Sequence, residues 1–276
     1  MKPANFLTRT ITALVFAVLM ICAVLAGALY FAILMLLVFN LGMIEFYRIV
    51  DRSAGKTARL SGHITGSLIF SLIFAYNFGL LAPEWLWVLP VLLITVFVVA
   101  LFNFPEYKIL TVGSTLSGIV LLALPLSLFA SLAIPFKVAA SLNGSEFVLI
   151  FLAILWIYDT SAYIIGSFIG KYKIYERISP GKTWEGAIGG LLVIVAVIRV
   201  ISALYPGLGL NHLLTISFII IAGGTLGDLC ESMIKRHAGV KDSGKMLPGH
   251  GGILDRFDAV LLSAPAVFLY VSVFEI

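Results

Sequence analysis

Long apolar runs separated by short polar segments make up most of the chain. A bilayer core about 30 Å thick is crossed by roughly 20 apolar residues in a helix, and nine runs approach that length. The first two are continuous, and we divide them near Gly27 because one helix over 10–47 would be about 57 Å long. The predicted spans are residues 10–27, 29–47, 61–81, 85–103, 110–133, 147–168, 187–205, 212–229 and 259–275. This pattern predicts an all-α, polytopic membrane protein with about nine transmembrane helices.

The composition excludes an ordinary soluble fold. Of the 276 residues, 61% are hydrophobic and only 12% are charged. Soluble domains carry roughly 45–50% apolar and about 25% charged residues. A domain of this length has too little interior to hide the surplus, so the surrounding solvent must be lipid.

Basic residues gather in alternate loops, and this bias predicts the orientation. Lys and Arg concentrate in the cytoplasmic loops of membrane proteins. Nine spans place four basic segments on one side, namely the N-terminus, the 48–60 loop, the 169–186 loop and the loop after the eighth span. The opposite loops 134–146 and 206–211 hold only Lys137. We therefore expect a multi-pass protein of the cytoplasmic (inner) membrane, with its N-terminus and its basic loops in the cytoplasm.

The distribution of polar residues divides the chain into two regions of one integral membrane unit. Residues 1–146 are expected to form a transmembrane scaffold, and residues 147–276 a transmembrane catalytic region. Four acidic residues of the scaffold lie at helix ends or in short turns, where solvated caps and interface anchors explain them: Glu45, Asp51, Glu84 and Glu106.

Asp159 is an ionisable residue well inside the predicted sixth span. A carboxylate at that depth is costly and must face a wet cavity, a cation or a metal. Ser161 and Tyr163 lie nearby and suit either such a cavity or ordinary hydrogen bonding between packed helices. Asp159 is therefore a functional candidate.

Lys182 belongs to the loop that follows the sixth span. The preceding residues, Ser179-Pro180-Gly181, predict a turn that presents Lys182 at the membrane surface. A lysine there can bind a substrate phosphate, or it can anchor the protein to lipid headgroups.

The densest charge lies between Asp228 and Asp258. These 31 residues hold five acidic and five basic side chains. If the eighth span continues as a helix, three- and four-residue spacings put one polar stripe on a single face, formed by Asp228, Glu231, Ser232 and Lys235. A loop rich in Gly and Pro follows, and Asp255 begins the ninth span together with Asp258.

Carboxylates and bases mixed in this way suit nucleotidyl or phosphoryl transfer. Mg²⁺ takes one or two protein carboxylates together with substrate phosphates, and Asp228, Asp255 and Asp258 can supply them. Lys and Arg can neutralise the remaining phosphate oxygens. On local sequence, His250 fits a general base, a phosphate contact or a plain loop histidine. A transporter or ion channel with a cation path formed by Asp159 and Asp228 is a rival interpretation, although its charges should be spread across the membrane.

The same segment resembles the signature of the phosphatidate cytidylyltransferase family, also called CDP-diacylglycerol synthases. The matching residues are Ser232-x-x-Lys235-Arg236-x₄-Lys241-Asp242-x-Gly244-x-x-Leu247-Pro248-x-His250-Gly251-Gly252-Ile253-x-Asp255-Arg256-Phe257-Asp258. Two upstream motifs extend the resemblance, Trp156-x-x-Asp159-x-x-Ala162-Tyr163 and Ser179-Pro180-Gly181-Lys182-Thr183-Trp184. Together they cover about the C-terminal 120 residues, whereas the N-terminal half resembles the family only in its hydropathy.

The resemblance implies an all-helical membrane enzyme that transfers CMP from CTP to phosphatidate and releases pyrophosphate. It also implies Mg²⁺, a second cation (K⁺), a homodimer, and no nucleic-acid partner. Asp228, Asp255 and Asp258 would be metal-binding or catalytic carboxylates. The other expected catalytic or substrate-binding residues are Asp159, Lys182, Ser232, Lys235, Arg236, Lys241, Asp242, His250 and Arg256. A CTP-dependent lipid kinase, which releases CDP in place of pyrophosphate, is the alternative with similar substrates.

Overall fold

The computed structural model describes residues 3–53, 56–103, 108–135, 143–249 and 251–274. Within these ranges, helix covers most of each predicted span. Seven of the described helices are long and apolar enough to cross a membrane, which confirms the polytopic, all-α fold. The other two predicted spans correspond to Thr10–Leu25 and to Arg59–Asn77, so the count of nine stays a prediction.

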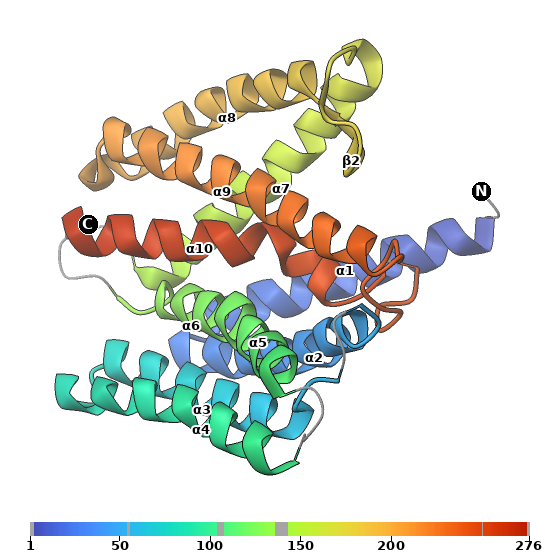
Figure 1. Ribbon diagram of the computed structural model, residues 1–276. Coiled ribbons are helices and arrows are strands. Elements are labelled where there is room, and N and C mark those ends of the chain that lie inside the picture. Colours follow the sequence, from blue (N-terminus) through green and yellow to red (C-terminus); the bar gives the residue numbers. More distant parts are fainter. Residues whose placement is uncertain (1–2, 54–55, 104–107, 136–142, 250, 275–276) are drawn as a thin grey trace.

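The N-terminal half forms one side of the molecule (Figure 1). Its elements are α1 (Pro3–Leu25), α2 (Ala28–Val50), α3 (Arg59–Asn77), the 3-10 turn η1 (Pro83–Trp87), α4 (Val88–Asn103), α5 (Lys108–Gly118), the π-turn η2 (Ile119–Ala123) and α6 (Leu124–Ser131). Gly27 separates α1 from α2 with a φ of 112°, a conformation that suits glycine. The predicted division at this residue is therefore confirmed.

The C-terminal half contains α7 (Gly144–Ile169), β1 (Lys173–Tyr175), β2 (Ser179–Thr183), α8 (Trp184–Leu204), η3 (Pro206–Leu208), α9 (Leu210–His237) and α10 (Leu254–Phe274). The two strands form an antiparallel hairpin in which Lys173 pairs with Thr183 and Tyr175 with Ser179. The predicted turn over Ser179-Pro180-Gly181 is thus wrong, because these residues are strand and the turn lies at 176–178. Pro180 is tolerated because both strands of an isolated hairpin are edge strands.

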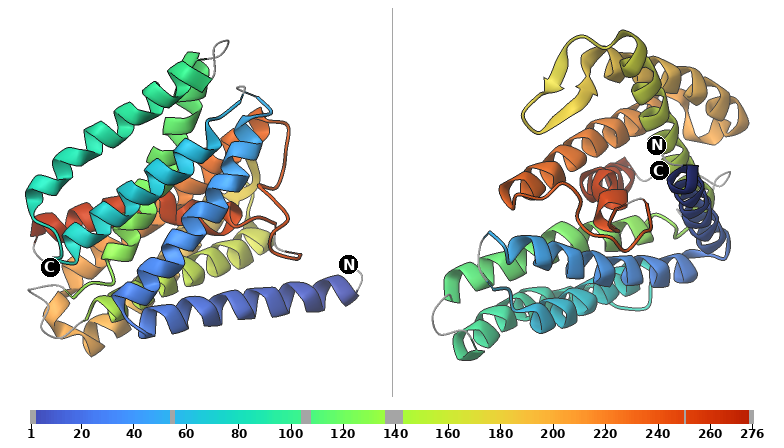
Figure 2. Two further views of the ribbon diagram at one scale, coloured as in Figure 1. Left: turned by 90° about the horizontal axis from the view of Figure 1, so that it is seen from below. Right: turned by 90° about the vertical axis from the view of Figure 1, so that its right-hand side faces the viewer.

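Helix α10 runs through the middle of the molecule (Figures 1 and 2). It packs along α9 on one side and against α6 on the other. Glycines let α9 approach closely, since a Cβ at Gly223 would lie 2.7 Å from the Cα of Ser263 and one at Gly227 would collide with the carbonyl of Asp258. Small residues permit such contacts between membrane helices. They bring the polar end of α9 against the first turns of α10.

Large apolar side chains cover much of the exterior. Phe168 is 84% exposed and Trp87 is 79% exposed, while Phe31 and Phe129 are completely buried. A water-soluble monomer rarely exposes contiguous apolar surface of this kind. The arrangement fits a protein whose outer surface contacts lipid.

Candidate functional site

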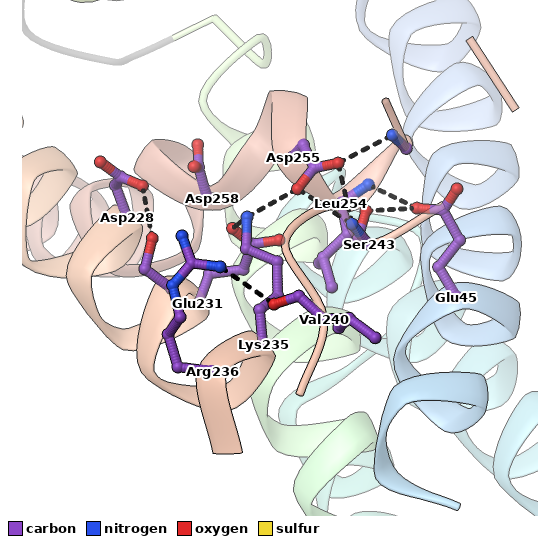
Figure 3. A network of polar contacts seen from close by, with 12 residues as sticks. Glu45, Asp228, Glu231, Lys235, Arg236, Val240, Ser243, Leu254, Asp255 and Asp258 are labelled. Carbon is purple, nitrogen blue, oxygen red and sulfur yellow. Dashed lines mark hydrogen bonds and ion pairs between the residues drawn. The ribbon is translucent and has the colours of Figure 1, made fainter. Parts of the chain in front are cut away.

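Three carboxylates meet where α9 packs against α10. Asp228 and Glu231 lie one helical turn apart on α9, and Asp258 comes from α10 (Figure 3). One oxygen from each residue lies within 4.8 Å of the others. Among the described residues, no other group of Asp, Glu, His or Cys side chains is gathered as closely. We call Asp228, Glu231 and Asp258 the acidic cluster.

The chemistry of the acidic cluster fits a hard divalent cation. Glu231 is 3% exposed, and its Oε1 atom is buried without a hydrogen-bond partner among the described residues. A buried carboxylate oxygen in that state is costly unless a cation or a donor satisfies it. Mg²⁺ prefers such oxygen ligands, so these residues could hold the metal that the resemblance implies.

Lys235 joins the acidic cluster to Asp255. Its Nζ atom lies 2.5 Å from Oε2 of Glu231 and 2.7 Å from Oδ1 of Asp255. Asp255 also accepts hydrogen bonds from the backbone amides of Ser243, at 3.0 Å, and Gly252, at 2.8 Å. The geometry therefore groups Glu231, and not Asp255, with the other two carboxylates. The helical stripe predicted from three-residue spacing already contained Glu231, but the expected metal ligands did not include it.

A polar cavity of about 410 Å³ opens beside the acidic cluster. Helices α7, α9 and α10 and the β hairpin supply its lining, which includes Asp159, Tyr163, Lys182, Asp228 and Asp258. The Nζ atom of Lys182 lies 2.5 Å from Oδ2 of Asp228. Because β2 carries Lys182 over the end of α9, a base from the hairpin reaches a carboxylate of the cluster.

A second cavity, of about 440 Å³, is also lined by Asp258 of the acidic cluster. It is bounded by α1, α7 and α10, and its apolar lining includes Phe16, Met20 and Leu152. Asp159, Asp255 and Asp258 line both cavities, whereas Asp228 lines only the polar cavity and Glu231 lines neither. Asp258 is thus the member of the acidic cluster that the two cavities share.

Known proteins resemble nearly the whole chain in sequence. The model of the cytidylyltransferase family matches residues 7–274. The chain belongs to the cytidylyltransferase family. A phosphatidate cytidylyltransferase of Staphylococcus epidermidis is 32% identical over 261 residues, covering 93% of this chain and 95% of that protein. Those of Staphylococcus haemolyticus and Staphylococcus aureus are 46% and 44% identical, each over 45% of this chain and 48% of the relative.

Membership of the cytidylyltransferase family confirms the resemblance and the prediction of an enzyme. The match also corrects one expectation. The N-terminal half resembles the family in more than its hydropathy, since the family match begins at residue 7. The scaffold is therefore part of what the family has in common.

Of the remaining predicted residues of this cytidylyltransferase family member, Arg256 lines a cavity, whereas Ser232, Arg236, Lys241 and Asp242 line neither of the two. The Ser232 hydroxyl donates to Oδ1 of Asp228 at 3.3 Å. Arg256 is exposed and lines the second cavity. Arg236 donates to the Val240 carbonyl at 3.0 Å (Figure 3). Lys241 and Asp242 are exposed on the loop after α9, and His250 lies outside the described residues.

Ser161 and Tyr163, the two polar residues near Asp159, differ in their surroundings. The Ser161 hydroxyl donates to carbonyls of its own helix, those of Ile157 at 2.7 Å and Tyr158 at 3.0 Å. This bonding within one helix matches neither of its two interpretations, since Ser161 lines neither cavity and its hydroxyl makes these bonds inside α7 and not between packed helices. Tyr163, in contrast, is 77% exposed and lines the polar cavity.

Glu45 is the functional candidate that sequence reasoning missed. The prediction of a solvated cap or an interface anchor is wrong, because the side chain of Glu45 is completely buried. It bonds to the loop that joins α9 to α10. The sequence gives one weak signal, a single acidic residue inside an otherwise apolar span.

Proposed function

We propose that this enzyme transfers CMP from CTP to phosphatidate and forms CDP-diacylglycerol and pyrophosphate. Family membership and the names of the relatives support the substrates. The observation that carries the proposal is that Asp258 of the acidic cluster lines both the polar cavity and the second cavity. A polar nucleotide in one cavity and an amphipathic lipid in the other can then approach the same carboxylate.

CTP would occupy the polar cavity. Lys182 would lie against its phosphates, where a cation offsets the negative charge that builds up during transfer. Asp228, Glu231 and Asp258 would hold Mg²⁺, which lowers repulsion between phosphate oxygens when it is bound. The K⁺ ion that the resemblance implies stays a prediction, and so does Asp255 as a metal ligand.

Phosphatidate would place its headgroup near Asp159, with its acyl chains along the apolar wall formed by α1 and α7.

The phosphate of phosphatidate is already anionic near neutral pH, so no residue of the chain has to act as a strong base. A phosphate oxygen attacks the α-phosphorus of CTP, a new P–O bond forms, and the bond to the β-phosphate breaks. Pyrophosphate leaves with its negative charge. Positioning and charge stabilisation supply most of the rate, as in phosphoryl transfer generally.

The basic loops support a cytoplasmic position for this site. CTP is a cytoplasmic nucleotide, and the β hairpin with Lys182 belongs to one of the loops rich in Lys and Arg. We therefore propose that the polar cavity opens to the cytoplasm, and that the enzyme works as a homodimer. Labelling of the hairpin by a reagent that cannot cross the membrane would test the orientation. The mass of the detergent-solubilised protein would test the homodimer.

One assay tests the reaction. Purified protein is incubated with radiolabelled CTP and phosphatidate vesicles, with and without Mg²⁺. We expect lipid-linked CMP and pyrophosphate in equal amounts, and no product without Mg²⁺. Release of CDP would favour a CTP-dependent kinase, and ion flux without consumption of CTP would favour a channel.

A further inference from the structure

We propose that Glu45 is a positioning residue, which holds the loop between α9 and α10 in the shape that CMP transfer requires. The proposal rests on the function proposed above. Glu45 lies in α2, far from the catalytic region in the sequence, and is 0% exposed. A buried carboxylate contributed by the scaffold needs a physical reason, and its contacts supply one.

One oxygen of Glu45 bonds to two separate points, one early in the loop and one at the start of α10. Its Oε2 atom accepts a hydrogen bond from the Ser243 hydroxyl at 3.0 Å and another from the Leu254 amide at 3.0 Å (Figure 3). Ser243 stands near the start of the loop, and Leu254 is the first residue of α10. The carboxylate therefore links an early part of the loop, six residues after the end of α9, to the first residue of α10.

The loop backbone closes around this carboxylate. A Cβ atom at Gly244 or at Gly252 would collide with the carboxyl group of Glu45. Only glycine allows the backbone so near another group. Gly244 and Gly252 both belong to the signature that resembles the phosphatidate cytidylyltransferase family. The close approach of the loop backbone to Glu45 gives a physical reason for their presence.

The same loop supplies the partners of Asp255. The Ser243 amide donates to Oδ2 of Asp255 at 3.0 Å and the Gly252 amide donates to it at 2.8 Å. Asp255 in turn accepts from Lys235 at 2.7 Å. A shift of the loop would therefore move Asp255 and, through Lys235, the carboxylate of Glu231. Glu45 acts on the acidic cluster through this chain of contacts and does not touch it.

The contacts indicate that Glu45 is needed as an acceptor and not as a charge. In the part of the chain that the structure describes, it makes no ion pair. Its Oε1 atom has no hydrogen-bond partner there. An amide would keep the accepting oxygen and remove an uncompensated buried charge, which is costly. The substitution Glu45→Gln should therefore preserve activity, whereas Glu45→Leu should not.

The test compares Glu45→Gln, Glu45→Leu and Tyr47→Phe in the CTP assay, together with thermal unfolding in detergent. Tyr47 is the matched control, because it is on α2, is 0% exposed, and donates to the Thr115 carbonyl at 3.1 Å, away from the loop. We expect Glu45→Leu to lower kcat by about 10- to 100-fold, as loss of supporting contacts around a site commonly does. The KM for CTP should change little, and Glu45→Gln should keep most of the rate. Tyr47→Phe should lower the unfolding temperature while kcat stays unchanged.

Three results would overturn the proposal. The first is a wild-type kcat in Glu45→Leu, and the second is an equal loss of kcat in Tyr47→Phe, which would indicate a general effect of destabilising α2. A loss in Glu45→Gln as large as in Glu45→Leu would show that the charge matters. If Glu45→Leu does not fold, Ser243→Ala removes one donor only and should still lower kcat. Absence of turnover in the wild type would instead refute the proposed function.

Discussion

Lys182 and Asp228 form an ion pair of 2.5 Å between the β hairpin and α9. Both side chains are partly buried, at 29% and 26% exposure, and both line the polar cavity. The lysine is thus paired with a carboxylate of the acidic cluster. When CTP binds, the phosphates would compete with Asp228 for this cation.

Lys182→Ala should lower kcat/KM for CTP by on the order of 100-fold, because a charge aimed at the phosphates is removed. Lys182→Arg should retain part of the activity. Lys173→Ala and Lys245→Ala are the controls, since both lysines are exposed and neither lines a described cavity. Initial rates at varied CTP measure the effect. Equal loss in Lys173→Ala would mean that the hairpin as a whole, and not Lys182, binds the nucleotide.

The acidic cluster gives a prediction that separates Glu231 from Asp255. Asp258→Asn should abolish turnover, because Asp258 belongs to the acidic cluster and also lines both cavities. Glu231→Gln should raise the Mg²⁺ concentration that gives half-maximal rate, since one ligand loses its charge. Asp255→Asn should lower kcat without that shift, because its partners are Lys235 and two loop amides.

A titration with Mg²⁺ at saturating CTP measures these differences. Arg199→Ala is the control, because Arg199 is exposed on α8 away from the cluster. The assignment of the acidic cluster fails if Asp258→Asn turns over at the wild-type rate. It also fails if Asp255→Asn, and not Glu231→Gln, shifts the Mg²⁺ dependence.

Much of the fold follows from the sequence, because the constraints that set it are local. The thickness of the bilayer fixes the length of an apolar run, and most of each run is helix. Asp228 and Glu231 share a helical face by spacing alone. The hairpin was missed because Ser179-Pro180-Gly181 has the composition of a turn, whereas pairing with β1 makes it a strand.

The partners of single carboxylates could not be read from the sequence. Glu45 and the loop that it holds lie about 200 residues apart in the chain, and no local pattern reports that contact. Asp255 and Asp258 look equivalent at the start of a helix. Two loop amides and Lys235 donate hydrogen bonds to the carboxylate of Asp255, whereas Asp258 belongs to the acidic cluster. Only the folded loop distinguishes them.

The second cavity predicts that α1 affects the lipid substrate and not the nucleotide. Ala17 lines this cavity, and Ala17→Trp would fill part of its volume. We expect a higher KM for phosphatidate and an unchanged KM for CTP. Leu14→Trp is the control, because Leu14 is 63% exposed on the outer side of α1. An unchanged KM for phosphatidate in Ala17→Trp would place the lipid elsewhere.

Gly227 sets the distance between the helices that carry the acidic cluster. A Cβ at this position would collide with the Asp258 carbonyl, so Gly227→Ala should push α9 away from α10. Overpacking of this kind typically costs about 1–3 kcal/mol, and the carboxylates of Asp228 and Asp258 would separate. Gly113→Ala is the matched control, because Gly113 is also helical and a Cβ there meets no atom within 4 Å.

We expect Gly227→Ala to lower the unfolding temperature in detergent, to raise the Mg²⁺ requirement and to reduce kcat, while Gly113→Ala changes none of the three. The Mg²⁺ requirement is the informative measurement, since it depends on the spacing of the ligands as well as on overall stability. If Gly227→Ala is destabilised but keeps the wild-type Mg²⁺ dependence, contact between α9 and α10 does not control the acidic cluster.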